Sequence, residues 1–395
     1  MAKENRSTII TTKSNKGISY LTARQVHTIS RKNRRITHEL EKRNNRKNVP
    51  EAEYTTTMKN PENVVEFDNL HTYFFTDAGT VKAVNGVSFD VPAGKTVGVV
   101  GESGCGKSVM SLSLMRILQR PQGQIVEGKI RFNLGFTAYD IARMPDDEMR
   151  KIRGNNVAMI FQEPMTSLNP VFRIGTQIDE VIALHNPEMN KVQIRERTIA
   201  MLNTVSIANC TGVYKMYPHE LSGGMRQRVM IAMALACNPR LIIADEPTTA
   251  LDVTIQAQIL DLLRNLKDKI NSSIMLITHD LGVIAEMADY VVVMYAGRVV
   301  EQGTAREIFK SPCHPYTIGL MNSKPAVNKQ VDRLYSIPGK VPNPINMPNY
   351  CYFRDRCELA IDCCQGEYPR EIKLSPTHKV SCYRYYQEQE GCKHE

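Results

Sequence analysis

One glycine-rich segment limits the possible folds more than any other part of the chain: Gly101-Glu102-Ser103-Gly104-Cys105-Gly106-Lys107-Ser108 matches G-x-x-x-x-G-K-[ST] in full. The apolar run Thr96–Val100 predicts a strand directly before it, and apolar residues at helical spacing predict a helix directly after it. A strand, a glycine loop and a helix in this order form a cradle of backbone N–H groups for phosphates. The flanking pattern argues against a chance glycine-rich turn.

The residue types in this loop assign roles within the cradle. Lys107 is expected to reach the β- and γ-phosphates of a nucleotide, and the hydroxyl of Ser108 to ligate Mg²⁺. The predicted nucleotide-binding residues of the segment are Gly101, Ser103, Gly104, Cys105, Gly106, Lys107, Ser108 and Val109.

A second apolar run, Leu241–Ala244, ends in two carboxylates, Asp245 and Glu246. Parallel sheets bind ligands at the carboxyl ends of their strands. We therefore expect Asp245 to hold Mg²⁺ through its water shell and Glu246 to take a proton from an attacking water. Two adjacent acids could form a solvated turn instead, but the phosphate loop in the same chain favours the catalytic interpretation.

Short β-branched runs alternate with longer helical patterns from about residue 64 to 310. The alternation predicts an α/β fold whose sheet is mainly parallel and carries helices on both faces. We expect an extension over 1–62, a nucleotide-binding domain over 63–310 and a proline-rich C-terminal module over 311–395.

The net charge of +9 belongs to the first residues rather than to the folded part. Residues 1–50 hold 13 Lys and Arg against 3 Asp and Glu, whereas residues 51–395 hold 37 against 38. The sequence predicts a basic, disordered extension without the apolar region of a signal peptide. Contact of this extension with acidic lipids or with RNA stays open. No apolar run reaches about 18 residues, so we expect no membrane-spanning segment.

Four further segments resemble the motifs of ATP-binding-cassette (ABC) ATPases. They are the signature motif at Leu221–Arg228, the Q-loop at Phe161-Gln162-Glu163-Pro164, the D-loop at Ala250-Leu251-Asp252 and the switch histidine at Thr278-His279-Asp280. Met225 departs from the usual glutamine, a departure that peptide-importer ATPases often share. The resemblance spans about residues 64–385 and implies an antiparallel β subdomain and a helical subdomain at about 165–220.

This resemblance also implies roles for individual residues. Gln162 contacts Mg²⁺ and the attacking water, so that Mg²⁺ is shared by Ser108, Gln162 and Asp245. His279 hydrogen-bonds the γ-phosphate and orients Glu246. Phe74 stacks on adenine, with Tyr73 and Phe75 as alternatives. The nucleotide-binding set then also includes Ser222, Gly223, Gly224 and Asp252.

Residues 314–320 and 337–344 resemble the C-terminal extension of oligopeptide and dipeptide importer ATPases, a group that includes nickel importers. The implied function is ATP hydrolysis that drives import of peptides, or of nickel or another small solute. The implied partners are a second ATPase subunit, favoured to be a paralogue, two membrane permeases and, through them, an extracytoplasmic solute-binding protein. The chain would lie at the cytoplasmic face of the membrane. A soluble ABC ATPase acting on nucleic acid or ribosomes is disfavoured, because those proteins usually fuse two cassettes.

A cysteine cluster at 351–382 lies in a segment with few apolar residues, and such segments often need a metal to become ordered. Its spacing differs from the C-x2-C of zinc ribbons. It resembles the cysteine motif of peptide-importer ATPases, which implies a [4Fe–4S] cluster held by Cys351, Cys357, Cys364 and Cys382. Zinc and unligated thiols stay open as alternatives, and Cys363 could replace Cys364.

Overall fold

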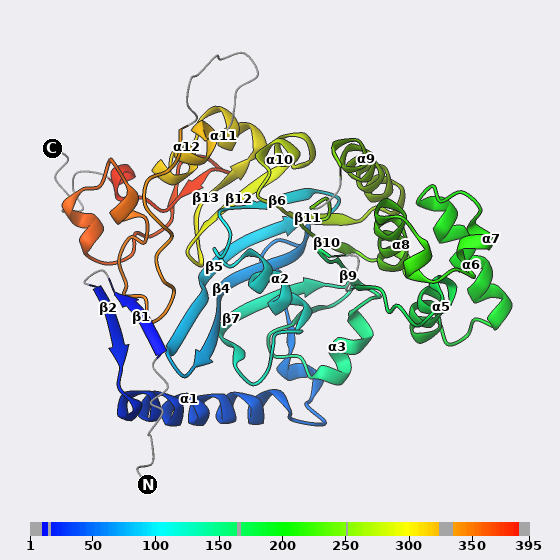
Figure 1. Ribbon diagram of the computed structural model, residues 1–395, viewed down its shortest axis with the longest axis horizontal. Helices are drawn as coiled ribbons and strands as arrows, with labels where there is room; N and C mark the ends of the chain where they lie inside the picture. Colours follow the sequence, from blue (N-terminus) through cyan, green and yellow to red (C-terminus); the bar gives the residue numbers. More distant parts are fainter. Residues whose placement is uncertain (1–9, 15–16, 164–166, 250–251, 324–334, 387–395) are drawn as a thin grey trace, which may run out of the picture.

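The computed structural model describes residues 10–14, 17–163, 167–249, 252–323 and 335–386. Its centre is an eight-stranded sheet beside a five-stranded sheet (Figure 1). None of the described helices combines the length and the apolarity needed to cross a bilayer.

The eight-stranded sheet has the order β14-β15-β13-β12-β6-β11-β10-β9. The five strands from β12 to β9 are parallel, whereas the contacts of β13, β14 and β15 are antiparallel. The bounds are β6 Thr96–Val100, β9 Val157–Ile160, β10 Leu241–Asp245, β11 Ser273–Ile277, β12 Tyr290–Tyr295, β13 Arg298–Thr304, β14 Ile372–Lys373 and β15 Lys379–Val380.

The central strands are buried on both faces, which explains their continuous apolar runs. In β10, Ile242 and Ala244 face one core while Leu241 and Ile243 face the other. The covering helices are α2 Lys107–Met115, α8 Gly223–Leu235, α9 Val253–Ile270, α10 Leu281–Met287, α11 Ala305–Lys310 and α12 Pro315–Asn322. The predicted α/β fold with a mainly parallel core sheet is confirmed.

The five-stranded sheet is antiparallel, with the order β3-β8-β7-β4-β5. Its strands are β3 Thr55–Thr56, β4 Asn63–Thr76, β5 Gly79–Pro92, β7 Gly123–Asn133 and β8 Ala138–Asp140. Together with α2 it encloses the second core. Tyr54 is buried in that core and β3 pairs with β8, so the packed domain begins before residue 63.

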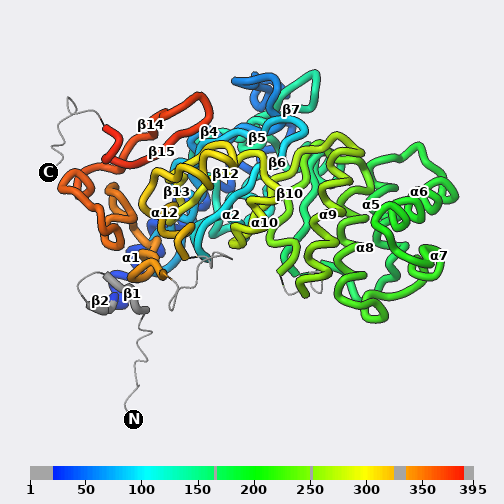
Figure 2. Tube along the Cα trace, turned by 90° about the horizontal axis from the view of Figure 1, so that it is seen from above, coloured from blue at the N-terminus to red at the C-terminus, as the bar shows by residue number. Residues whose placement is uncertain are grey.

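The described α-helices between β8 and α8 are α3 Asp146–Ile152, α5 Ile174–His185, α6 Lys191–Thr204 and α7 Cys210–Val213. Helices α5, α6 and α7 form one end of the molecule, and the cysteine-rich segment forms the other (Figures 1 and 2). The predicted helical subdomain at about 165–220 corresponds to α5–α7.

The expectation of a disordered N-terminal extension is wrong over residues 10–14 and 17–44. A hairpin of β1 (Ile10–Ser14) and β2 (Gly17–Leu21) precedes α1 (Ala23–Asn44), which begins with a capping box between Thr22 and Gln25. The charge composition did not predict this helix, because the face of α1 that packs on the protein carries polar as well as apolar side chains. Asn33, which is buried, donates to the carbonyl of Thr76 at 2.8 Å.

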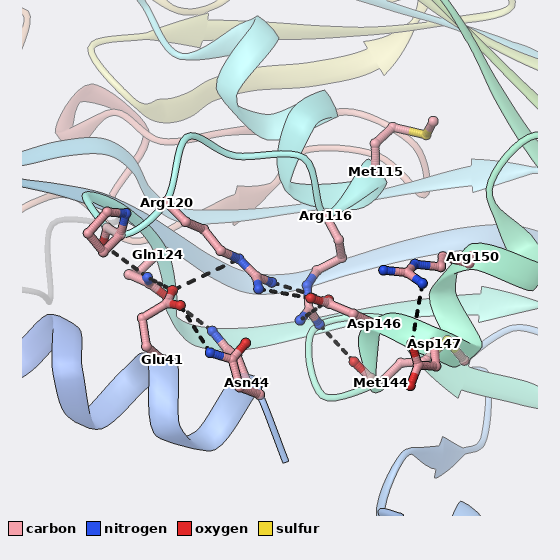
Figure 3. Close-up of polar contacts among 12 residues, drawn as sticks. Glu41, Asn44, Met115, Arg116, Arg120, Gln124, Met144, Asp146, Asp147 and Arg150 are labelled. Atoms are coloured by element: carbon pink, nitrogen blue, oxygen red, sulfur yellow. Dashed lines mark hydrogen bonds and ion pairs between the residues drawn. The ribbon is translucent and has the colours of Figure 1, made fainter. Parts of the chain in front are cut away.

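Further polar contacts tie the C-terminal half of α1 to β7 (Figure 3). Asn44 donates to Gln124 at 3.0 Å, and Gln124 donates to Glu41 and to the carbonyl of Pro121. Arg120 lies between Glu41, at 3.9 Å, and Asp146, at 2.9 Å. The helix therefore lies along the antiparallel sheet as part of the packed molecule.

The C-terminal module is less separate than the sequence predicts. Its strand β15 pairs with β13, and β14 pairs with β15, so residues from 372 onward extend the main sheet. The physical reason is that Glu301 of β13 accepts backbone N–H groups from Cys313 and His314 and contacts His378 Nε2 at 2.8 Å. Side-chain hydrogen bonds thus hold the module against the sheet where its own apolar core is small.

Candidate nucleotide-binding site

The glycine loop runs from the end of β6 to the start of α2 and closes on itself. Gly106 caps α2 with φ of 99°, and a Cβ there would lie 2.2 Å from the carbonyl oxygen of Ala83. Only glycine fits that approach. Lys107 is buried, and its Nζ donates to the carbonyls of Gly101 at 2.7 Å and Glu102 at 3.2 Å. Lys107 Nζ thus lies inside the loop that is predicted to bind the nucleotide phosphates.

A cavity opens at this loop, and its volume of about 630 Å³ is within the usual range for a small-molecule site. Six chain segments line it: β5, the loop with the start of α2, the segments that follow β9, β10 and β11, and the C-terminal extension. The lining residues are Val81, Ala83, Ser103, Gly104, Gly106, Lys107, Ser108, Val109, Gln162, Glu246, Thr249, His279 and Pro344.

Glu246 follows β10 and is the centre of a polar cluster. Its carboxylate accepts hydrogen bonds from Gln162 Nε2 and from Thr249 Oγ1, both at 3.0 Å, and lies 3.2 Å from His279 Nδ1. The three predicted catalytic residues, Gln162, Glu246 and His279, are therefore brought together. Glu246 has φ of 47°, the left-handed region that a β-carbon disfavours, and this strain is typical of functional sites.

Asp245, the last residue of β10, is buried, and burial raises the pKa of its carboxyl group. A hydrogen bond from Ser108 opposes that shift, and the charge of Glu246 adds to it. Within the part of the chain that the structure describes, Asp245 Oδ1 has no hydrogen-bond partner. A buried, unpaired carboxylate oxygen beside a serine hydroxyl fits Mg²⁺, which prefers oxygen ligands.

The aromatic residue predicted to stack on adenine lies one strand away from the cavity lining. Phe74 of β4 is opposite Val81 of β5, and Val81 lines the cavity. Phe75 is buried in the molecule, and the hydroxyl of Tyr73 donates to Asn85 at 2.8 Å. Phe74 and Tyr73 are both partly exposed, and stacking of Phe74 on adenine remains a prediction.

The signature loop does not join this cavity within one chain. Ser222 is exposed and caps α8, its Oγ accepting from the N–H of Met225 at 3.3 Å, and Gly223 is also exposed. Gly224 packs against Ile255. Asp252 caps α9, while Ala250 and Leu251 lie outside the described residues.

Sequence reasoning missed four lining residues: Val81, Ala83, Thr249 and Pro344. Thr249 follows Glu246 by one helical turn, a spacing that could have suggested its contact with the carboxylate. The other three have no such signal, because they reach the cavity through pairing of distant segments. The backbone N–H of Lys82 donates to the carbonyl of Pro344 at 3.1 Å.

The four predicted cysteine ligands lie at the far end of the molecule. Cys351, Cys364 and Cys382 are buried. A hydrogen bond from the Cys351 thiol lowers the pKa of Cys364 to about 6, and the charge of Cys364 raises the pKa of Cys357 and Cys382 in addition to burial. Cys363 is disulfide-bonded, so it is not a free thiol that could replace Cys364. Within the described residues, the side chains close enough together to share a metal ion are Glu301, Cys313 and His378, and no three of the four predicted cysteine ligands form such a group.

Comparison with known proteins agrees with this geometry. A family model described as ABC transporter matches residues 84–249, and one described as oligopeptide/dipeptide transporter, C-terminal region, matches residues 300–364. The oligopeptide transport ATP-binding protein AppD of Bacillus subtilis is 50% identical over 325 residues, or 82% of this chain and 98% of AppD. OppD of Salmonella typhimurium is 46% identical over 338 residues, or 85% of this chain and 98% of OppD.

Among solved structures, a dimeric ATP-binding cassette in a post-hydrolysis state with ADP and phosphate is similar, at a TM-score of 0.54 and 26% identity. The match covers 61% of this chain and 99% of that cassette. Relatives this similar, matched over nearly their whole length, decide the assignment. The chain belongs to the ABC transporter family, as an ATP-hydrolysing protein that uses ATP and Mg²⁺.

Proposed function

We propose that this chain hydrolyses ATP in the cavity at its glycine loop and thereby drives the import of oligopeptides or dipeptides. The observation that carries the proposal is the polar cluster of Gln162, Glu246 and His279 at the mouth of the phosphate loop. The peptide substrate rests on relatives named as oligopeptide and dipeptide transport proteins.

The chemistry follows from positions of charge and proton acceptors. Lys107 and the N-terminus of α2 would neutralise the phosphates, and Ser108, Asp245 and Gln162 would hold Mg²⁺ with its water. Bound Mg²⁺ would neutralise the negative charge that develops on the transferred phosphoryl group. Glu246, held between Gln162 and His279, would accept the proton of the attacking water.

The site needs a second cassette, because Ser222, Gly223 and Gly224 do not line the cavity of their own chain. Their helix N-terminus and hydroxyl would face the γ-phosphate of the partner. We propose a paralogous ATPase subunit as that partner. Two permeases would hold the pair at the cytoplasmic face of the membrane and connect it to a solute-binding protein. Exposed apolar Val171 and Phe172, next to α5, support a docking surface for a permease.

We further propose that Cys351, Cys357, Cys364 and Cys382 hold a [4Fe–4S] cluster. The support is the burial of Cys351, Cys364 and Cys382 and the mutual electrostatic effects of the four thiols. Such a cluster would supply order to a segment that has little apolar core.

The test is reconstitution of the chain with its permeases and a paralogous ATPase subunit in vesicles. We expect MgATP hydrolysis that rises when receptor loaded with peptide is added, together with uptake of radiolabelled peptide. Receptor loaded with Ni²⁺ is the matched comparison. Stimulation by Ni²⁺ and none by peptides of two to five residues would overturn the peptide assignment.

A further inference from the structure

One arginine of the cysteine-rich segment reaches the phosphate loop. Arg356 donates to both carboxylate oxygens of Glu102, from Nη1 at 2.7 Å and from Nη2 at 3.0 Å. The Arg356 side chain is only 5% exposed, so solvent screens this pair weakly. Glu102 is the second residue of the glycine loop, and 254 residues separate it from Arg356.

The guanidinium is fixed in every direction. Its remaining donors go to the carbonyls of Pro338 at 2.7 Å and Ile337 at 3.4 Å and to the hydroxyl of Tyr295 at 3.3 Å. Five N–H donors thus have five contacts, which is the full capacity of an arginine. The Arg356 guanidinium is therefore held in one place, and its two hydrogen bonds fix the position of the Glu102 carboxylate.

Glu102 is held a second time by the C-terminal extension. Its backbone N–H donates to the hydroxyl of Tyr316 at 2.8 Å, and Tyr316 packs on Tyr295 and Phe353 with ring centroids 4.6 and 5.4 Å away. On its other side the carbonyl of Glu102 accepts from Lys107 Nζ at 3.2 Å. The glutamate therefore connects the extension to the lysine of the loop.

Arg356 also belongs to the cysteine cluster by position. It ends the short 3₁₀ turn Arg354–Arg356, whose first N–H donates to the carbonyl of Cys351 at 3.2 Å. Cys357 follows directly, and its N–H donates to the carbonyl of Arg354 at 3.2 Å. Two of the proposed metal ligands thus bracket the turn that carries the arginine.

From these contacts we infer that Arg356 is a positioning residue of the nucleotide site, through which the cysteine cluster sets the affinity of the glycine loop for MgATP. Arg356 neutralises the carboxylate of the residue before Ser103, which lines the cavity; without the arginine, this carboxylate would add an unpaired negative charge next to the nucleotide site. This inference rests on the proposed assignment of the loop to those phosphates. Disorder at Cys351 or Cys357 frees the turn, and the loop loses its neutralising partner.

The experiment is a double-mutant cycle on the full chain, with the dissociation constant of a non-hydrolysable MgATP analogue measured by calorimetry. We expect Arg356→Gln to weaken binding about tenfold, because the Glu102 carboxylate is left unpaired. Glu102→Gln alone should change binding less than threefold. The double variant should return to within threefold of the wild type, since the repelling charge is absent.

The matched control is Arg354→Gln in the same turn, whose guanidinium stacks on Tyr350 and contacts Asp355, away from the loop. It should leave binding unchanged. Losses that simply add in the double variant, or an equal loss in Arg354→Gln, would overturn the inference. Lys107→Ala distinguishes failure of this inference from failure of the proposed nucleotide site. If the wild type binds the analogue no better than Lys107→Ala does, the proposed nucleotide site itself is refuted.

The link to the cysteines is tested by epistasis. Cys357→Ser should weaken binding about tenfold in the wild-type background and less than twofold in the Arg356→Gln/Glu102→Gln background. Because coupling between sites is reciprocal, the analogue should also slow alkylation of Cys357, followed by mass spectrometry at that residue. An equal effect of Cys357→Ser in both backgrounds, or unchanged alkylation, would refute the link.

Discussion

The catalytic carboxylate is predicted to be separable from nucleotide binding. Glu246→Gln preserves the shape of the side chain and its contacts with Gln162 and Thr249 but removes the proton acceptor. We expect hydrolysis by the assembled transporter to fall about 10²–10⁴-fold while MgATP affinity stays within threefold. Glu286→Gln, on the surface of α10, is the control. A steady-state rate within twofold of wild type would exclude Glu246 as the base.

The glycine loop and the carboxylate pair could be predicted from sequence, because they follow directly from the ends of predicted strands. The switch histidine was implied by the resemblance to ABC ATPases. Contacts between remote segments could not. Pro344 reaches the loop through pairing of β5 with residue 345, and Arg356 reaches it through a partly buried ion pair. Neither contact leaves a periodic signal in the chain.

At the scale of elements, α1 is the clearest departure from the sequence prediction. A run of basic residues was expected to stay solvated, and on the outer face of α1 it does: Arg24, Arg31, Arg35 and Lys42 are exposed. The opposite face carries Asn33 and Thr37, which are buried against the antiparallel sheet. An amphipathic pattern made partly of polar residues is weak in hydropathy but sufficient for docking.

Removal of residues 1–47 should lower thermal stability and leave the nucleotide site intact. The hydrogen bonds that Asn33, Arg43 and Asn44 donate to the sheet are lost, together with the one that Glu41 accepts from Gln124, each contributing about 1 kcal/mol. We expect the melting temperature to fall by about 5–10 °C and MgATP affinity to stay within twofold. Arg31→Ala, on the outer face, should change neither. An unchanged melting temperature would show that α1 does not dock in solution.

At the scale of the whole molecule, the residues of the proposed shared site lie on two separate surfaces of one chain. Lys107 lies in the cavity, whereas Ser222 is exposed at the start of α8. Lys107→Ala should therefore weaken MgATP binding in the isolated chain more than tenfold. Ser222→Arg should leave that binding unchanged and block hydrolysis only in the assembly, because the added side chain occupies the interface between cassettes.

Asn190→Ala is the matched control for Ser222→Arg, since it also removes a helix cap, at α6. It should lower stability by about 1 kcal/mol without blocking hydrolysis in the assembly. Equal losses of nucleotide affinity in isolated Lys107→Ala and Ser222→Arg would contradict a site shared across two chains.

The bridge between Val81 and Ile345 also has a consequence for how the chain is made. These residues lie 264 positions apart, and Pro344 beside them is one wall of the nucleotide cavity. At a synthesis rate of about 5–20 residues per second, roughly 13–50 s pass between the appearance of the two sides. During that interval the nascent cassette has its glycine loop but no finished cavity. Nucleotide can help to stabilise the protein only after nearly the entire chain has left the ribosome.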